Sequence, residues 1–153
     1  MTEHHDALKR MQYELMLISR YQLRPSHKDE PTMDRSAYVL LSRLELATPM
    51  TIKELAHALR LDISTVHRQL GALLRTGHVA YVAGVAGEVA RRIAPTPAGR
   101  AALIDTRASY EDGLNSVVAD WPEERQRQFT ALLREFNQGV ETMEDAPWPR
   151  PGD

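Results

Sequence analysis

The chain has 153 residues, a formal net charge of −2 at pH 7, 42% hydrophobic and 26% charged residues, and no cysteine. These values are ordinary for a single globular domain, and the lack of cysteine excludes disulfides, a thiol nucleophile and a cysteine redox sensor. No apolar run reaches the roughly 18 residues that cross a bilayer, and the start lacks a signal peptide's apolar core. We therefore expect one domain over residues 1–153, cytoplasmic and without a membrane partner.

The first third of the chain predicts two helices separated by a loop. Apolar side chains recur every three or four residues over about 7–22, which predicts an amphipathic helix. Residues 24–33 carry two prolines and mixed charges, and they predict a loop. Asp34 is a typical N-cap, so a second helix is expected from there to about residue 47.

The central stretch predicts two short helices joined by a tight turn. Thr51 and Glu54 form a capping box, in which each side chain accepts a hydrogen bond from an otherwise unpaired amide of the other residue. The helix that begins there should end near Arg60. A second helix is expected over 62–75, with Asp62 as its cap.

A β-hairpin is expected next, with strands at 78–83 and 88–94 around a tip at 84–87. Two helices and a hairpin in this order are typical of a winged helix-turn-helix, which places one helix in the DNA major groove. Residues 50–100 carry seven Lys and Arg against three Asp and Glu, whereas 101–153 carry five against eleven. The positive charge therefore lies in the segment predicted to read nucleic acid.

Two more helices are expected after the hairpin. Thr96 and Pro97 open the first, with the proline tolerated in its first turn. Asp120 is the expected cap of the second. The last residues, 144–153, hold three prolines and are expected to form an unpacked, flexible tail.

The terminal helices, about 7–22 and 97–143, are more than a reading lobe of about 34–96 needs for support. We expect these helices to interlock in a two-fold dimer, because readers of this kind use two-fold symmetry to address two half-sites. A larger monomeric core is the alternative.

Three stretches show patterns of a known family in type and order: ELAHALRLDISTVHRQLGALLRTGHV (54–79), TPAGR (96–100) and WPEERQRQFTALLREF (121–136). Over about residues 8–143 the sequence resembles the MarR family of bacterial transcriptional regulators. The resemblance implies a mainly α fold, a winged helix-turn-helix with long N- and C-terminal dimerisation helices. It also implies a homodimer and double-stranded DNA as the partner.

The resemblance makes 62–75 the recognition helix. Arg68 is the first candidate for base reading, because an arginine can donate two hydrogen bonds to guanine O6 and N7. The other DNA-binding candidates are Ser64, Thr65 and His67 near the start of the helix, and Lys53 and Arg75 as phosphate contacts. A solvated surface charge is the alternative for the last two, and an exposed surface histidine for His67.

The hairpin tip departs from the family pattern, which carries an arginine there that enters the minor groove. The matching positions are Gly87, Glu88 and Val89. Arg91 and Arg92 follow, and neighbouring residues of a strand point to opposite faces. One of them could reach DNA while the other pairs with acidic side chains; alternatively, both only stabilise the wing.

MarR-like dimers often have an apolar crevice between the dimerisation helices and the DNA-binding lobe, receptive to small aromatic or acidic effectors. The effector candidates are Tyr13, Met16, Tyr38 and Tyr110, with Arg20 or Arg43 meeting a carboxylate. Ordinary core packing is the alternative for these side chains.

No metal, cofactor or enzymatic activity is expected. The adjacent His4 and His5 at the chain terminus are poorly organised as metal ligands, and no phosphate-binding loop or catalytic motif is present. The sequence thus favours a homodimeric repressor that binds a pseudo-palindromic operator and is released by a small molecule. A winged-helix protein-interaction module that has lost DNA binding is the alternative, favoured by the uncharged wing.

Overall fold

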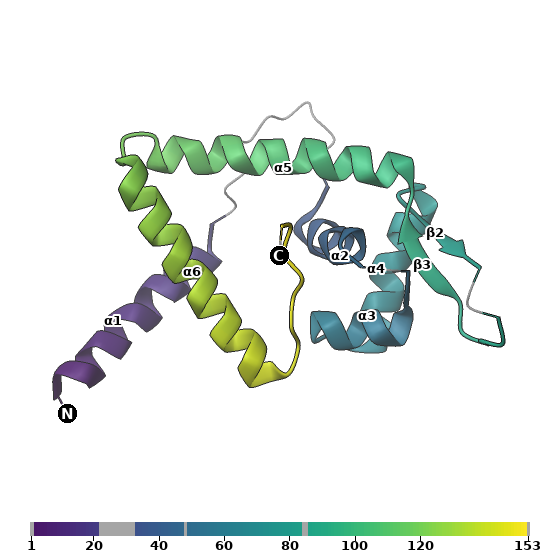
Figure 1. Ribbon diagram of the computed structural model, residues 1–153, viewed down its shortest axis with the longest axis horizontal. Helices are drawn as coiled ribbons and strands as arrows, with labels where there is room; N and C mark the ends of the chain where they lie inside the picture. Colours follow the sequence, from purple (N-terminus) through teal and green to yellow (C-terminus); the bar gives the residue numbers. More distant parts are fainter. Residues whose placement is uncertain (1, 22–32, 48, 84–85, 153) are drawn as a thin grey trace.

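The computed structural model describes residues 2–21, 33–47, 49–83 and 86–152. Within these residues the fold is mainly helical with a small antiparallel sheet, which confirms the predicted fold class (Figure 1). The predicted loop at 24–33, except its last residue, and the tip residues 84 and 85 lie outside the described residues. The elements are α1 (Thr2–Ser19), α2 (Arg35–Glu45), β1 (Met50–Thr51), α3 (Ile52–Leu59), α4 (Ile63–Arg75), β2 (Val79–Val82), β3 (Arg92–Pro95), α5 (Pro97–Val118) and α6 (Glu123–Glu144).

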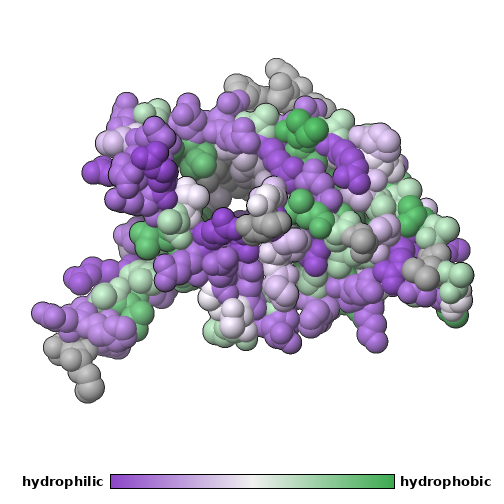
Figure 2. Space-filling view, in the orientation of Figure 1, coloured by the Kyte–Doolittle hydropathy of each residue, from purple (hydrophilic) through white to green (hydrophobic). Residues whose placement is uncertain are grey.

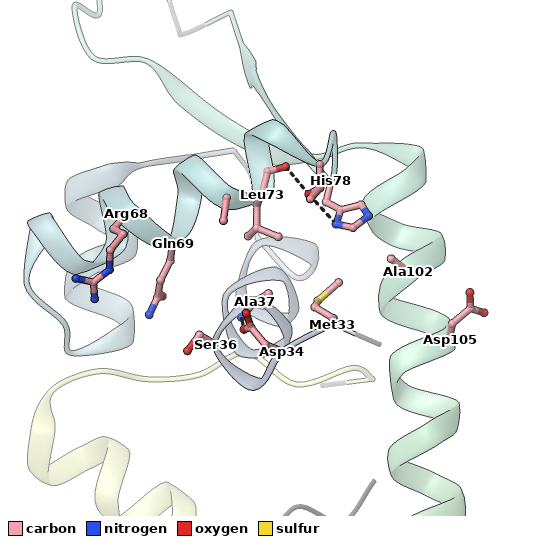
Figure 3. Close-up of a pocket in the computed structure, with 12 residues that line it drawn as sticks. Met33, Asp34, Ser36, Ala37, Arg68, Gln69, Leu73, His78, Ala102 and Asp105 are labelled. Atoms are coloured by element: carbon pink, nitrogen blue, oxygen red, sulfur yellow. Dashed lines mark hydrogen bonds between the residues drawn. The ribbon is translucent and has the colours of Figure 1, made fainter. Parts of the chain in front are cut away.

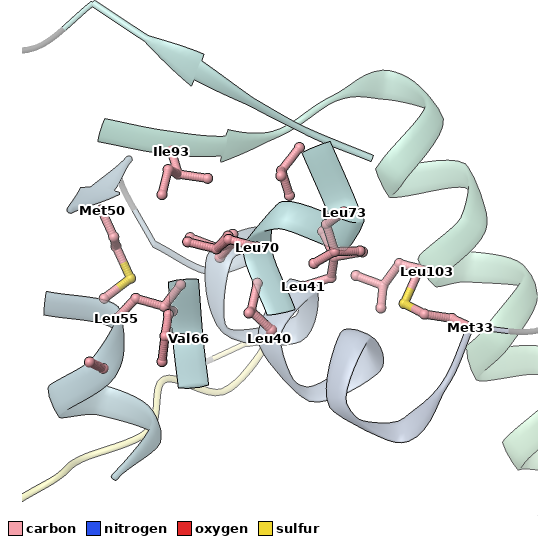
Figure 4. Packing of buried hydrophobic residues seen from close by; sticks show 13 residues of the cluster. Met33, Leu40, Leu41, Met50, Leu55, Val66, Leu70, Leu73, Ile93 and Leu103 are labelled. Carbon is pink, nitrogen blue, oxygen red and sulfur yellow. The ribbon is translucent and has the colours of Figure 1, made fainter. Parts of the chain in front are cut away.

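One apolar core joins α2, α3, α4, the sheet and the start of α5 (Figure 4). We call this part of the molecule, residues 33–103, the head. Its fully buried side chains come from every one of these helices and from β3, so each element contributes a face to the same core. The largest of them are Leu40, Leu41, Leu44, Leu55, Val66, Leu70, Ile93 and Leu103.

The sheet has the order β1-β3-β2, with both pairings antiparallel. The hairpin was predicted, but its second strand begins at Arg92 rather than at residue 88. The two-residue strand β1 was not predicted, because Met50 and Thr51 are too short a run to show a period. Met50 pairs with Ile93 and Thr51 with Arg92, so β1 attaches the start of α3 to the wing.

Local capping explains most helix starts. The side chains of Asp34 and Thr96 accept amide hydrogen bonds at the starts of α2 and α5, and Thr51 and Glu54 form the predicted capping box of α3. Asp62 is the N-cap of α4, but its side chain makes no capping hydrogen bond there.

The predicted aspartate cap of α6 is wrong. The N-cap is Pro122, whose carbonyl oxygen accepts from the amides of Arg125 and Gln126 at 2.9 and 3.2 Å. Asp120 lies two residues earlier, in the turn in which the Trp121 amide still bonds the Val118 carbonyl oxygen. The helix therefore begins too late for the aspartate to reach its free amides.

Helices α1, α5 and α6 extend away from the head as arms (Figure 1). Only the first half of α5 is buried, at Gly99, Leu103 and Thr106, and no described residue of α1 or α6 is buried. Figure 2 shows an opening between α5, α6 and the C-terminal segment, and apolar side chains on the α1 arm. These arms have a hydrophobic surface that this chain alone does not cover.

The expectation of an unpacked C-terminal tail is wrong. After α6 the chain turns at Asp145 and runs back to α2 (Figure 1). Ala146 is 7% exposed, and the Trp148 amide donates to Glu141 Oε2 at 3.1 Å. Prolines exclude a helix here but leave the segment free to pack through Ala146 and Trp148, and composition alone does not reveal this.

Candidate nucleic-acid interface

The outward face of α4 presents polar side chains from a helix fixed by its opposite face. Val66, Leu70 and Leu73 are buried in the core. With 3.6 residues per turn, Arg68 and Arg75 lie on the side of α4 away from these three residues. Among the remaining candidates Ser64 and His67 are exposed and Thr65 is half-buried.

Arg68 has a free guanidinium in an exposed position. It makes no hydrogen bond or ion pair with any other described residue. Together with Gln69 it lies at one end of a cavity of about 680 Å³ between α4, the start of α2 and α5, while Ala102 and Asp105 lie at the other end (Figure 3). The side chain is therefore available to a ligand that contacts the outer face of α4.

A second cationic group lies where α3 meets the start of α4. A hollow of about 370 Å³ is lined by Lys53, His57 and Arg60, with Asp62 as its only acidic lining residue among those described. Arg60 was missed by the sequence reasoning, although it stands in the basic segment and closes α3. Its backbone is left-handed, with φ 56° and ψ 42°, a conformation that costs a non-glycine residue about 1 kcal/mol.

The wing arginines have different surroundings. Arg92 donates to Glu88 through Nη2 at 2.7 Å and Nε at 2.8 Å, and through Nη1 to Glu54 Oε2 at 3.1 Å and to the Pro49 carbonyl oxygen at 2.9 Å. The hydrogen bond to Glu88 is the main reason that the pKa of Arg92 is raised. Because Glu54 also completes the α3 capping box, Arg92 fastens the wing to the head.

Arg91 is exposed and lies over the Tyr81 ring, with its guanidinium carbon 5.2 Å from the ring centroid. The hairpin geometry thus separates two neighbouring arginines into one held by carboxylates and one that faces outward. Val89, at one of the positions where the family pattern has its arginine, is fully exposed.

The six effector candidates do not form one site within this chain. Tyr38 and Tyr110 stack with ring centroids 4.8 Å apart, beside a hollow of about 310 Å³ that Arg107 also lines. Arg43 lines a different cavity, below the C-terminal segment. Tyr13, Met16 and Arg20 are exposed on α1. Arg107, missed from sequence, pairs with Glu45 at 2.6 Å and ties α5 to α2.

Two searches of the described residues concern other kinds of function. No group of three or more histidine and acidic side chains in them is arranged to hold a metal ion. None of the helices in the described ranges is both long and apolar enough to cross a membrane.

Known proteins match both the head and the whole chain. Residues 34–83 match the model of the IclR helix-turn-helix domain. A relative from Bacillus subtilis, the uncharacterized HTH-type transcriptional regulator YxaD, is 26% identical over 137 residues, which cover 88% of this chain and 96% of the relative. The chain therefore carries a helix-turn-helix domain of the kind found in transcriptional regulators.

Solved structures extend the match to the arms. A MarR family protein from Bacillus stearothermophilus superposes with a TM-score of 0.66 at 22% identity, covering 91% of this chain and 94% of that protein. The chain has the MarR fold. Another protein with this fold, Streptococcus pneumoniae FabT solved in complex with DNA, matches with a TM-score of 0.61 at 17% identity, covering 93% and 98% of the two chains. The MarR fold includes the arms, whereas the IclR model spans only the head.

Proposed function

We propose that the protein is a homodimeric transcriptional repressor that binds a pseudo-palindromic operator with α4 in the major groove and releases it when a small molecule binds. The observation that carries the proposal is the outward face of α4, where Arg68 is exposed and free of partners among the described residues. The FabT complex supports it, because that protein shares the fold and was solved with DNA.

The hollow at the start of α4 supports a phosphate contact beside the major groove. Lys53 and Arg60 are both exposed there, and phosphate oxygens are the usual partners of such side chains in protein–DNA complexes. We propose that these two residues and Arg75 position the head, while Arg68 reads a base and Ser64, Thr65 and His67 contact bases or phosphates.

Release follows from differential affinity. A dimer presents two copies of α4, and their spacing must fit two half-sites about one helical turn apart. An effector that binds more tightly to a dimer with another spacing weakens operator binding by that difference in free energy. Tyr38 and Tyr110, with the other four effector candidates, remain proposed contacts for such a molecule.

Replacing Arg68 with alanine tests the reading role. We expect Arg68→Ala to weaken specific operator binding by about 1–3 kcal/mol per half-site, because a bidentate contact with guanine is lost. Binding to random DNA should change much less. The measurement is a fluorescence-anisotropy titration at fixed salt, with an operator selected from random sequences by the purified protein.

Arg100→Ala is the charge-matched control, since Arg100 is exposed in the head but lies on α5. If Arg68→Ala weakens operator and random DNA equally, Arg68 contacts phosphate and reads no base. If the unaltered protein selects no DNA sequence even at low salt, the repressor proposal fails, and the protein-interaction module takes its place.

The two wing arginines should respond differently to substitution. Arg91→Ala is expected to reduce the slope of log affinity against log salt by about 1 per half-site, because one phosphate contact per wing is lost. Arg92→Ala should instead lower the melting temperature, because it leaves Glu54 and Glu88 without their cation. Salt titrations of DNA binding and thermal melts of both variants separate the two roles, and an unchanged slope in Arg91→Ala would remove the wing from the interface.

A further inference from the structure

The C-terminal segment, residues 145–152, covers a cavity on the head. The cavity has a volume of about 460 Å³ and lies between α2, α3, β3 and this segment. Ala47, Met50 and Pro147 form part of its apolar wall, and Arg43, Glu54 and Arg92 are its charged side chains. A space of this size, mostly apolar with a few polar groups, is typical of a site for a small molecule.

The segment is held mainly by α6. Glu141 accepts hydrogen bonds from the Trp148 amide at 3.1 Å and from Arg150 Nη1 at 3.1 Å, and it also pairs with Arg150 Nη2. These hydrogen bonds, above all those from Arg150, lower the pKa of the Glu141 carboxyl. The segment is therefore anchored to its own helix and rests on the head through Ala146 and Trp148, as a lid does.

Arg43 lies below this lid in an unusual state. Its guanidinium carbon is 5.8 Å from the centroid of the Trp148 ring. Its Nε and Nη1 atoms are closed to solvent and have no hydrogen-bond partner among the described residues. Burial lowers the pKa of Arg43. A buried donor without an acceptor costs about 1–3 kcal/mol, so an acceptor supplied to Arg43 would be bound favourably.

The other charged groups do not supply that acceptor. Glu54 is already hydrogen-bonded to Arg92 and to the Thr51 amide, and Arg92 is bonded to Glu88 as well. The charge that lacks a counter-ion in the cavity is therefore that of Arg43. Trp148 covers the face of the guanidinium, so an acceptor must approach the donors at its edge.

We propose that this cavity binds a small organic anion, with a carboxylate or similar oxyanion beside Arg43 and an apolar body against Ala47, Met50 and Pro147. Because Nε and Nη1 are closed to solvent, residues 146–150 must lift for the anion to reach them. The lid connects α6 to the head, where Arg60 Nε also lies 3.9 Å from Glu144 Oε2. Resting on the proposed repressor function, an occupied cavity would alter the position of the head against the arms and so the spacing of the two α4 helices.

The test uses Trp148 as the reporter. The chain has two tryptophans, so Trp121→Phe leaves Trp148 as the single one. In this background, titration with cyclohexanecarboxylate in the absence of DNA should give a saturable change in tryptophan fluorescence. Arg43→Gln should weaken binding at least about tenfold, since a charge-assisted hydrogen bond contributes about 1.5–3 kcal/mol. Arg35→Gln, a charge-matched change at an exposed position on the same helix, should leave it unchanged.

Two probes test the ligand class. Cyclohexanecarboxamide has the same body without the charge, and inorganic phosphate has the charge without the body; both should bind more weakly than cyclohexanecarboxylate. Equal binding by either probe, unchanged binding by Arg43→Gln, or no saturation by the carboxylate would overturn the proposal. Thermal melts check folding, and Arg43→Lys, which keeps the charge with fewer donors, should bind with intermediate affinity if Arg43→Gln fails to fold.

A DNA arm separates this site from the proposed function. The titration without DNA reports binding even if the protein has no operator. If cyclohexanecarboxylate binds through Arg43 but leaves DNA affinity unchanged, the site is upheld and its role as the effector site is overturned.

Discussion

Gly99→Ala is expected to destabilise the protein by roughly 3 kcal/mol, which for a chain of this size lowers the melting temperature by roughly 10 °C. A Cβ atom at this position would lie 2.0 Å from the His78 carbonyl oxygen and 2.8 Å from its carbonyl carbon. Both are backbone atoms, and the same carbonyl oxygen accepts from the Thr96 amide at 3.0 Å. The methyl group therefore forces α5 away from the turn that follows α4, and no flexible side chain can absorb the displacement.

Gly71→Ala is the matched control for this prediction. There a Cβ atom would meet only the end of the Arg75 side chain, at 3.4 Å, in the middle of α4. Alanine at a helical position of this kind should stabilise the protein by about 0.5–1 kcal/mol. Thermal melts at one protein concentration should therefore move in opposite directions for the two variants. A Gly99→Ala protein that melts with or above the unaltered chain would show that the contact between α5 and His78 is not rigid.

The TPAG motif shows what the sequence could and could not predict. Thr96 as cap and Pro97 in the first turn follow from local rules of helix starts, and both predictions are confirmed. The reason for Gly99 is a contact with His78, and a tertiary contact leaves no local pattern in the sequence. The capping box of α3 was predictable on the same local grounds, whereas the strand β1 beside it was not.

The candidate interface divides in the same way. The recognition helix, with Arg68 on its exposed side, follows from the apolar period of α4, which fixes the buried face. Alternation along a strand predicts that Arg91 and Arg92 differ, but not which of them meets Glu54 and Glu88. That choice depends on the register between β1 and β3, in which Thr51 pairs with Arg92. The C-terminal lid depends on Glu141 and Trp148 meeting around a turn, for which the composition of the tail gives no signal.

The arms carry the remaining claim, that two chains are needed to bind an operator. Apolar side chains on α1, α5 and α6 are between about two-fifths and four-fifths exposed, including Ile18 at 52%, Val117 at 59% and Leu132 at 64%. Leaving such stripes in water on three helices is unfavourable, because burying one such side chain contributes about 1.5–3 kcal/mol. The MarR fold places them together on the side of the molecule away from the core, where a second chain would cover them.

Leu132→Glu should therefore convert the protein to a monomer and weaken operator binding by about 100-fold or more, because the second half-site is no longer held at high effective concentration. The side chain is exposed in a single chain, and glutamate is a good helix former, so the head should still fold. Gln138→Glu adds the same charge on the opposite face of α6 and should leave both the mass and the affinity unchanged. Sedimentation velocity and anisotropy titrations on the same samples test both parts. A Leu132→Glu protein that stays dimeric would move the interface off α6, and a monomer that binds the operator as tightly as the unaltered chain would show that one head is sufficient.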